Sequence, residues 1–242
     1  MFAHLRSTLF NLVFYAFTLL TAIVMTPLTF LPSRRPVAVL LQGWAKGVVF
    51  LMRLVAGIRV EIRGIEHIDR SRPFVLAGKH QSECDGIIVL SLMPNLAVIA
   101  MKELGDYPFF GRLIRKLEMV LVDTCGGGSE RRTLIEGGRA ARADNRSILI
   151  YPEGHLMAVG KKHQYKPGVY HLAVDVGLPV VPVATNIGLR WDRRRWQKRP
   201  GPAVVEFLPP IMPGSDKAAF MDHLESAIES RTKGLVQEHQ AA

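Results

Sequence analysis

His80 and Asp85 are the residues of this sequence best suited to acid–base chemistry. They lie five positions apart in the run Lys79-His80-Gln81-Ser82-Glu83-Cys84-Asp85-Gly86. An imidazole can take a proton from a hydroxyl near neutral pH, and a carboxylate can orient that imidazole. On a continuous helix this spacing would leave the two side chains about 140° apart. Contact between them therefore requires His80 to precede the helix.

The sequence around the pair predicts a strand-to-helix turn. Residues 72–78 form a short apolar run typical of a buried strand, and residues 86–93 have the length of a helix that ends before a proline. Ser82 and Asp85 also match a helix-capping pattern, in which Ser82 bonds a free amide and Asp85 lies in the first turn. The two roles are compatible, since a carboxylate in the first turn can orient His80 from there.

The sequence contains two cysteines, Cys84 and Cys125, with no Cys-x-x-Cys spacing. We expect both thiols to be reduced, and no metal site is indicated. Cys84 lies four residues after His80, so a thiol nucleophile is an alternative to general-base chemistry. A small buried thiol in the first turn of the helix is the interpretation that we favour.

The rest of the chain alternates strand-length apolar runs with helical patterns, which predicts an α/β fold. The expected strands are 60–62, at a sheet edge, then 72–78, 96–101, 119–122, 148–151, 180–184 and 204–208. The expected further helices are 108–117, 129–143, 169–176 and 217–236. The sequence shows no internal repeat. We predict one domain over residues 59–242, with a mixed, largely parallel central sheet flanked by helices.

Residues 1–58 are predicted to form a membrane-anchoring helical hairpin. No charged side chain occurs between Arg6 and Arg34, and residues 8–31 are long and apolar enough to cross a bilayer. A cleaved signal peptide is less consistent, because the run is too long and no small-residue cleavage site follows it. Residues 37–58 contain two basic side chains and fit a helix at the membrane interface. Crossing and insertion into one leaflet are both compatible with this pattern.

The formal net charge of +10 favours an anionic partner. Residues 190–199 place two tryptophans among six basic side chains, a composition suited to lipid headgroups. A solvated loop and a nucleic-acid contact are the alternatives. Because the N-terminal anchor favours lipid, we expect membrane phospholipids and no nucleic acid as partners. Arg34 and Arg35 favour a domain on the cytoplasmic face of the cell membrane.

Further candidate residues follow the predicted strands, where sites gather in open parallel sheets. Lys102 follows 96–101, and the run Pro152-Glu153-Gly154-His155 follows 148–151. After 119–122, glycines at 126–128 precede Arg131 and Arg132, an arrangement able to hold an anion at a helix start. A turn capped by Ser129 is the alternative. No Lys-Ser or Lys-Thr follows the glycines, which excludes a P-loop nucleotide hydrolase.

Four motifs, taken in this order, resemble those of the glycerolipid acyltransferase family. They are His80 with Asp85, Lys102, Tyr-Pro-Glu-Gly at 151–154, and Val-Pro-Val-Ala-Thr-Asn at 181–186. The resemblance extends over residues 62–213, and the apolar amino terminus is similar as well. A single His-x-x-x-x-Asp is weak evidence for a family, whereas four ordered motifs are specific.

The resemblance implies that residues 59–242 are an acyltransferase domain that requires neither a metal nor another cofactor. A fatty acyl group would pass from acyl-CoA or acyl carrier protein to a lysophospholipid, at the sn-2 hydroxyl of 1-acylglycerol-3-phosphate. His80 would be the general base, Asp85 would orient it, and backbone amides near the turn would stabilise the oxyanion. The expected substrate-binding residues are Lys102, Glu153, Gly154, His155, Arg131 and Arg132. Glu153 has a local alternative, which is to bond neighbouring amides.

The acceptor contacts depart from the family pattern. The second motif usually begins with Gly and ends in Arg, whereas residues 118–124 begin with Glu and end with Thr124. The third usually continues Gly-Thr-Arg, whereas here Gly154 is followed by His155 and Leu156. A guanidinium holds a phosphate through paired hydrogen bonds that Thr and Leu cannot make. The other candidate cations are Lys102, His155, Lys161, Lys162 and Lys166.

The missing arginines leave two alternatives open. In one, the acceptor is a different lysolipid, such as a lysophosphodiester or a lyso-aminoacyl lipid. In the other, the chain is a non-catalytic lipid-binding protein on the same fold.

Overall fold

The computed structural model describes residues 2–107, 110–123, 128–193 and 195–240. They contain a seven-stranded sheet in the order β1-β7-β6-β2-β5-β3-β4. The strands are β1 (Ile58–Arg63), β2 (Val75–Gly78), β3 (Ala97–Met101), β4 (Val120–Val122), β5 (Ile148–Ile150), β6 (Val180–Thr185) and β7 (Gly201–Phe207). Neighbouring strands are parallel except for β6 and β7. The predicted α/β fold with a mixed, largely parallel sheet is confirmed.

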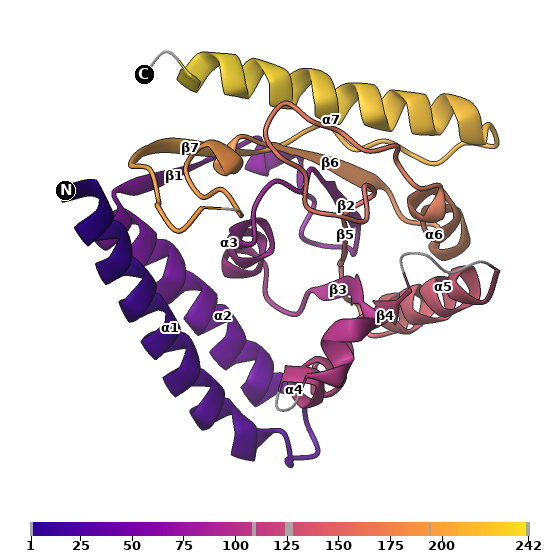
Figure 1. Ribbon diagram of the computed structural model, residues 1–242. Helices are drawn as coiled ribbons and strands as arrows, with labels where there is room; N and C mark the ends of the chain where they lie inside the picture. The colour runs from indigo at the N-terminus through magenta and orange to yellow at the C-terminus, as the bar shows by residue number, and fades with distance from the viewer. Residues whose placement is uncertain (1, 108–109, 124–127, 194, 241–242) are drawn as a thin grey trace.

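Helices cover both faces of the sheet (Figure 1). They are α1 (Phe2–Leu28), α2 (Arg35–Leu51), α3 (Cys84–Leu92), α4 (Phe110–Lys116), α5 (Gly128–Ala143), α6 (Gly168–Val176) and α7 (Lys217–Gln240). Val75 and Ala77 of β2 pack with α5, α6 and α7, whereas Leu76 packs with α2 and α3. Successive strand residues point to opposite faces, and both faces here are covered. This explains why the strands read as continuous apolar runs.

The observed strands match the predicted ones with small changes at their ends. The predicted strand 60–62 is β1, which lies at an edge of the sheet as expected. The predicted strand 72–78 is shorter than expected and begins at Val75. Pro73 has no amide N–H and cannot extend a ladder, which accounts for the later start.

The N-terminal segment forms a helical hairpin that packs on the rest of the protein (Figure 1). The Trp44 indole donates to Thr18 Oγ1 at 3.1 Å and links α2 to α1. A π-helical turn, Met52–Ala56, follows α2 and leads directly into β1. One apolar cluster contains Phe10 of α1 and Phe207 of β7. The hydrophobic core therefore continues across residue 58, and the predicted domain division at that residue stays a prediction.

Both N-terminal helices are long and apolar enough to cross a membrane by length and composition. They are Ala3–Leu28, with a mean hydropathy of 2.0, and Arg35–Ala56, with a mean hydropathy of 1.5. Along α1 the exposed apolar side chains recur at helical spacing, and each of them is 52–68% exposed: Leu5, Leu9, Leu12, Leu19, Leu20 and Ile23. The hairpin thus presents an apolar outer side that the described residues leave uncovered.

The two tryptophans of the basic run 190–199 have different environments. Trp191 is buried and packs edge-on against Phe10 at 5.2 Å and Phe14 at 5.4 Å. Trp196 is 53% exposed, and its indole donates to Thr8 Oγ1 at 3.1 Å. Trp191 is therefore a core residue that fastens α1, which the composition of the run did not indicate, while Trp196 remains available at the surface.

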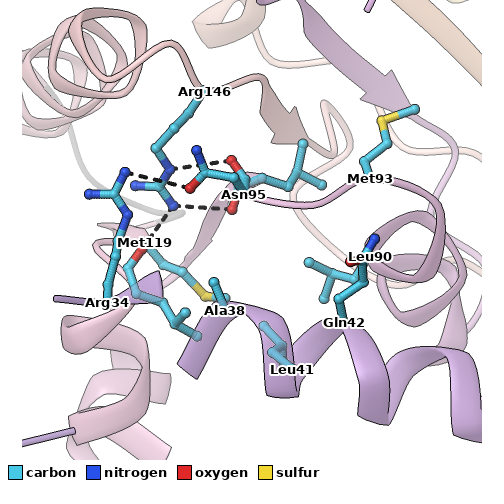
Figure 2. A pocket seen from close by; sticks show the side chains of 11 residues that line it. Arg34, Ala38, Leu41, Gln42, Leu90, Met93, Asn95, Met119 and Arg146 are labelled. Carbon is cyan, nitrogen blue, oxygen red and sulfur yellow. Dashed lines mark hydrogen bonds between the residues drawn. The ribbon is translucent and has the colours of Figure 1, made fainter. Parts of the chain in front are cut away.

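A pocket beside α2 contains two arginines with different environments (Figure 2). Arg146 is 3% exposed and donates to four backbone carbonyls, those of Asn95, Leu96, Leu117 and Glu118. Arg34 bridges two exposed carboxylates at 2.7 Å and 2.9 Å, those of Glu118 and Asp144. The described residues that line the pocket lie outside the His80 turn.

These environments predict unequal losses of stability. Arg146→Ala is expected to lower the free energy of unfolding by about 2–3 kcal/mol, because buried carbonyls lose their donors. Arg34→Ala is expected to cost about 1 kcal/mol or less, because its partners are exposed to solvent. Urea unfolding of both variants in the same detergent measures the difference, and equal losses would contradict it.

Candidate active site

His80 and Asp85 are in contact in the turn that joins β2 to α3. His80 Nδ1 lies 3.1 Å from Asp85 Oδ2, and His80 precedes the helix as the spacing requires. When Nδ1–H donates to the carboxylate, Nε2 keeps a lone pair that can accept a proton. The His80 side chain is 21% exposed and that of Asp85 is 5% exposed. This geometry is suited to general-base chemistry on a hydroxyl.

Asp85 also holds the turn together. Its Oδ2 accepts hydrogen bonds from the amides of Gln81 at 2.7 Å and Ser82 at 2.8 Å. Amides before a helix lack helical partners, so a first-turn carboxylate is a suitable acceptor for them. The capping role and the orienting role thus coexist on one oxygen. Ser82 Oγ itself accepts from the Cys84 amide at 3.3 Å.

The same bonds restrict where an oxyanion can be stabilised. The Gln81 and Ser82 amides point at Asp85, and the His80 amide lies 3.4 Å from Glu153 Oε2. We expected amides near the turn to serve the oxyanion, but these three already face carboxylates. Stabilisation of an oxyanion by amides near the turn stays a prediction, and the amides of residues 80–82 are already bonded to carboxylates.

Sequence reasoning gave Tyr151 no role at the site, but its ring stacks on that of His80. The ring centroids are 3.9 Å apart and the planes differ by 15°. Burial raises the pKa of Tyr151, and the negative charge of Asp85 adds to this effect, so the phenol stays neutral. The sequence placed Tyr151 in the Tyr-Pro-Glu-Gly motif, directly after a strand that proves to be the neighbour of β2, but did not indicate the stacking. Its ring can hold the imidazole plane in place.

Cys84 is fully buried, and burial raises the pKa of its thiol, with a further contribution from the charge of Asp85. A neutral buried thiol is a poor nucleophile. Cys84→Ala is therefore expected to retain acyl transfer within about threefold of wild type. Iodoacetamide labelling of a Cys125→Ala background should occur only after unfolding. A loss of activity as large as that of a His80 variant would instead favour the thiol mechanism.

Glu153 lies inside the protein, at the centre of a buried charge network. Its side chain is 0% exposed, and Lys79 Nζ donates to it at 2.8 Å. The same ammonium lies 2.7 Å from Glu229 of α7, whose carboxylate also accepts from the Tyr165 hydroxyl at 3.0 Å. Burial raises the pKa of Glu153, and the hydrogen bond from Lys79 opposes that shift. Sequence reasoning gave Glu153 a candidate role but gave none to Lys79 or Glu229.

The segment 152–166 is fastened over the His80 turn. The Met157 amide donates to the His80 carbonyl at 2.7 Å, and the His163 amide donates to Glu153 Oε1 at 3.1 Å. Gly154 has a φ of 69°, a left-handed conformation that favours glycine. His155, the next residue, is exposed. Gly154 and His155 thus lie beside the general-base candidate.

The remaining predicted substrate-binding residues lie on other elements. Lys102 follows β3, which β5 separates from β2, and its ammonium bonds Asp123 at 2.7 Å. That bond raises the pKa of Lys102. Arg131 and Arg132 are exposed on α5, and Arg132 pairs with Glu136 at 3.3 Å. Residues 124–127, which include Thr124, Cys125 and two of the three glycines, lie outside the described residues.

Comparison with known proteins identifies the family to which this chain belongs. Residues 59–186, more than half of the chain, match the family model described as Acyltransferase. The chain belongs to the acyltransferase family. Over 200 residues it is 32% identical to a 1-acyl-sn-glycerol-3-phosphate acyltransferase of Pseudomonas aeruginosa, which covers 81% of this chain and 77% of that protein. The class of enzyme that the motifs indicated is confirmed.

Two further proteins are similar to this acyltransferase, one in sequence and one in structure. A 1-acyl-sn-glycerol-3-phosphate acyltransferase of Limnanthes alba is 32% identical over 157 residues, which is 64% of this chain and 55% of that protein. The crystal structure of the 1-acyl-sn-glycerophosphate (LPA) acyltransferase PlsC from Thermotoga maritima superposes with a TM-score of 0.79 at 23% identity. It covers 96% of this chain and 97% of that one, and this likeness shows a shared fold.

Proposed function

We propose that this acyltransferase moves a fatty acyl group from acyl-CoA or acyl carrier protein to the sn-2 hydroxyl of 1-acylglycerol-3-phosphate, giving phosphatidic acid. The observation that carries the proposal is the 3.1 Å contact between His80 and Asp85 at a partly exposed strand-to-helix turn. The names of the Pseudomonas aeruginosa and Limnanthes alba relatives support the choice of acceptor.

In the proposed reaction His80 Nε2 accepts the hydroxyl proton while the acceptor oxygen attacks the thioester carbonyl. The tetrahedral intermediate then collapses and breaks the carbon–sulfur bond, and the imidazolium returns the proton to the departing thiolate. Asp85 holds the Nδ1–H tautomer and stabilises the imidazolium. The acyl group passes directly between substrates, so Cys84 has no covalent role. Tyr151 keeps the imidazole plane fixed throughout.

We propose that the hairpin formed by α1 and α2 attaches the enzyme to the cell membrane, with the catalytic domain on the cytoplasmic face. The apolar outer side of α1 supports this, since five of its leucines are more than half exposed: Leu5, Leu9, Leu12, Leu19 and Leu20. Trp196 lies beside Thr8 of the same helix, among basic side chains suited to anionic headgroups. A membrane-held enzyme would meet a lysophospholipid in the layer where that lipid resides.

A donor-by-acceptor matrix tests the proposed reaction. Purified protein in detergent is given acyl-CoA or acyl carrier protein with a panel of lysolipids, and both thiol release and the acylated product are measured. The proposal expects thiol release that depends on 1-acylglycerol-3-phosphate and yields phosphatidic acid. If none of the lysolipids in the panel causes thiol release, and His80→Ala behaves the same as wild type, the non-catalytic alternative is favoured.

The same matrix tests the second candidate acceptor. Leu156 stands where the family pattern carries an arginine, which favours a lysolipid with fewer negative charges than a phosphomonoester. Faster turnover of a lysophosphodiester or a lyso-aminoacyl lipid than of 1-acylglycerol-3-phosphate would replace the proposed acceptor and leave the chemistry of His80 unchanged.

A further inference from the structure

Glu229 of α7 joins the buried charge network from a distant part of the chain. Lys79 Nζ donates to Glu229 Oε1 at 2.7 Å and to Glu153 Oε1 at 2.8 Å. It also donates to the Lys161 carbonyl at 3.1 Å. An ammonium has three hydrogens to donate, so these three acceptors use all of them. Glu229 thus connects α7 to the residue that directly precedes His80.

The network lies just past the end of the ladder between β2 and β5. The last paired residues of that ladder are Ala77 and Ile150. The residues that follow carry the rings of His80 and Tyr151, which stack with centroids 3.9 Å apart. The residue before His80 is ion-paired at 2.8 Å with Glu153, which lies two positions beyond Tyr151. The ion pair therefore holds together the two chain segments whose rings form the stack.

The carboxylate of Glu153 also meets the backbone of the turn. Its Oε2 accepts from the His80 amide at 3.4 Å, and its Oε1 accepts from the His163 amide at 3.1 Å. Because the side chain is 0% exposed, water does not compete for these bonds. A displacement of Glu153 would therefore move the peptide that carries the His80 ring.

Glu229 is itself held from two sides. The Tyr165 hydroxyl donates to its Oε1 at 3.0 Å, and the preceding residue on α7, Ile228, is fully buried against the sheet. A lysine side chain has a flexible four-carbon stem, so fixed acceptors are needed to keep its ammonium in one place. Glu229 provides such an acceptor from a helix that is packed on the core. Without it, the ammonium of Lys79 and the carboxylate of Glu153 are free to move together.

We propose that Glu229 is a positioning residue for the general base and acts through Lys79 and Glu153. The proposal rests on the proposed function, in which His80 takes the proton of the acceptor hydroxyl. The effect of Glu229 passes through the backbone of the turn and through the stack of His80 on Tyr151. A misplacement of a catalytic group by about 1 Å can slow a reaction about 10²-fold. Glu229 should therefore influence kcat, whereas the affinity for either substrate should not depend on it.

Glu229→Ala tests this role against the matched control Glu225→Ala. Glu225 lies one turn earlier on α7, and the two side chains are similarly exposed, at 27% for Glu225 and 23% for Glu229. The ion pair of Glu225 with Lys162, at 2.6 Å, also joins α7 to the segment 152–166. The control therefore removes a comparable contact that does not include the residue before His80.

The initial rate of thiol release is measured at a temperature at which all variants are folded. Glu229→Ala is expected to lower kcat about tenfold or more, with the KM of donor and acceptor within about twofold of wild type. Glu229→Gln should restore most of kcat, because its carboxamide oxygen still accepts from Lys79. Glu225→Ala should keep the wild-type kcat. An equal kcat for the two alanine variants would overturn the role of Glu229.

Chemical modification of His80 separates failure of this role from failure of the proposed reaction. Diethyl pyrocarbonate modifies accessible imidazoles, and peptide mass spectrometry gives the rate at His80 relative to that at the exposed His223. The His80 side chain is 21% exposed in its stack. Glu229→Ala is expected to raise the ratio about threefold or more, because a loosened turn exposes the ring more often. This rise supports the role even when wild type shows no transfer to lysophosphatidate. An unchanged ratio, or an equal rise with Glu225→Ala, would overturn the role and leave the proposed reaction intact.

Discussion

His80→Ala is expected to lower kcat for acyl transfer by about 10²–10⁴-fold, the range usual for removal of a general base. His80 is the one described imidazole that contacts Asp85, at 3.1 Å, and it is partly exposed to solvent. Without it, the acceptor hydroxyl has to attack the thioester with its proton still attached. The loss should appear in kcat for every acceptor that the enzyme uses, because the proton transfer is common to all of them.

The measurement is the initial rate of thiol release at saturating donor and acceptor. His223→Ala is a matched control, because His223 is an exposed histidine on α7 and makes no contribution to the turn. Thermal unfolding of His80→Ala should resemble that of wild type, since a partly exposed side chain is removed. A folded His80→Ala protein with more than a tenth of the wild-type kcat would exclude His80 as the general base.

Lys79→Met is expected to lower the free energy of unfolding by about 3–5 kcal/mol, as when one partner of a buried ion pair is removed. Lys79 is 1% exposed and lies between Glu153 and Glu229. Without the ammonium, Glu153 is left as a buried carboxylate whose remaining partners are amides. The loss should be partly recovered in Lys79→Met/Glu153→Gln, because the double variant no longer buries an unpaired charge. Glu229 is 23% exposed and can turn toward water.

The pH dependence gives this prediction a second readout. Burial already raises the pKa of Glu153 in the folded protein, and loss of Lys79 removes a group that lowers it. A carboxyl whose folded pKa lies above its unfolded pKa favours folding below the unfolded pKa, and that contribution is lost as pH rises through the folded pKa. Lys79→Met should therefore be less destabilised at pH 5 than at pH 8. Urea unfolding at both pH values measures this, and a loss below 1 kcal/mol at pH 8 would contradict the role of the network.

Much of the fold was predictable because its signals are local. Apolar runs of strand length alternate with helical patterns, and the faces of β2 and β5 are both covered by helices. The contact between His80 and Asp85 was predictable for the same reason, since both groups lie within one turn of six residues. The long apolar helices at the amino terminus were also predictable, because their length and apolar composition are local properties of the sequence.

The sequence by itself determined the class of sheet, the strand-to-helix turn and the family of the chain, because each depends on residues close together along the chain or on ordered motifs. Only the tertiary structure decided that Lys79 pairs with a carboxylate 150 residues away, that Tyr151 stacks on His80 and that Trp191 is buried. Such contacts depend on which strands and helices become neighbours. Packing of the whole core determines that arrangement, so it cannot be predicted from any short segment of the sequence.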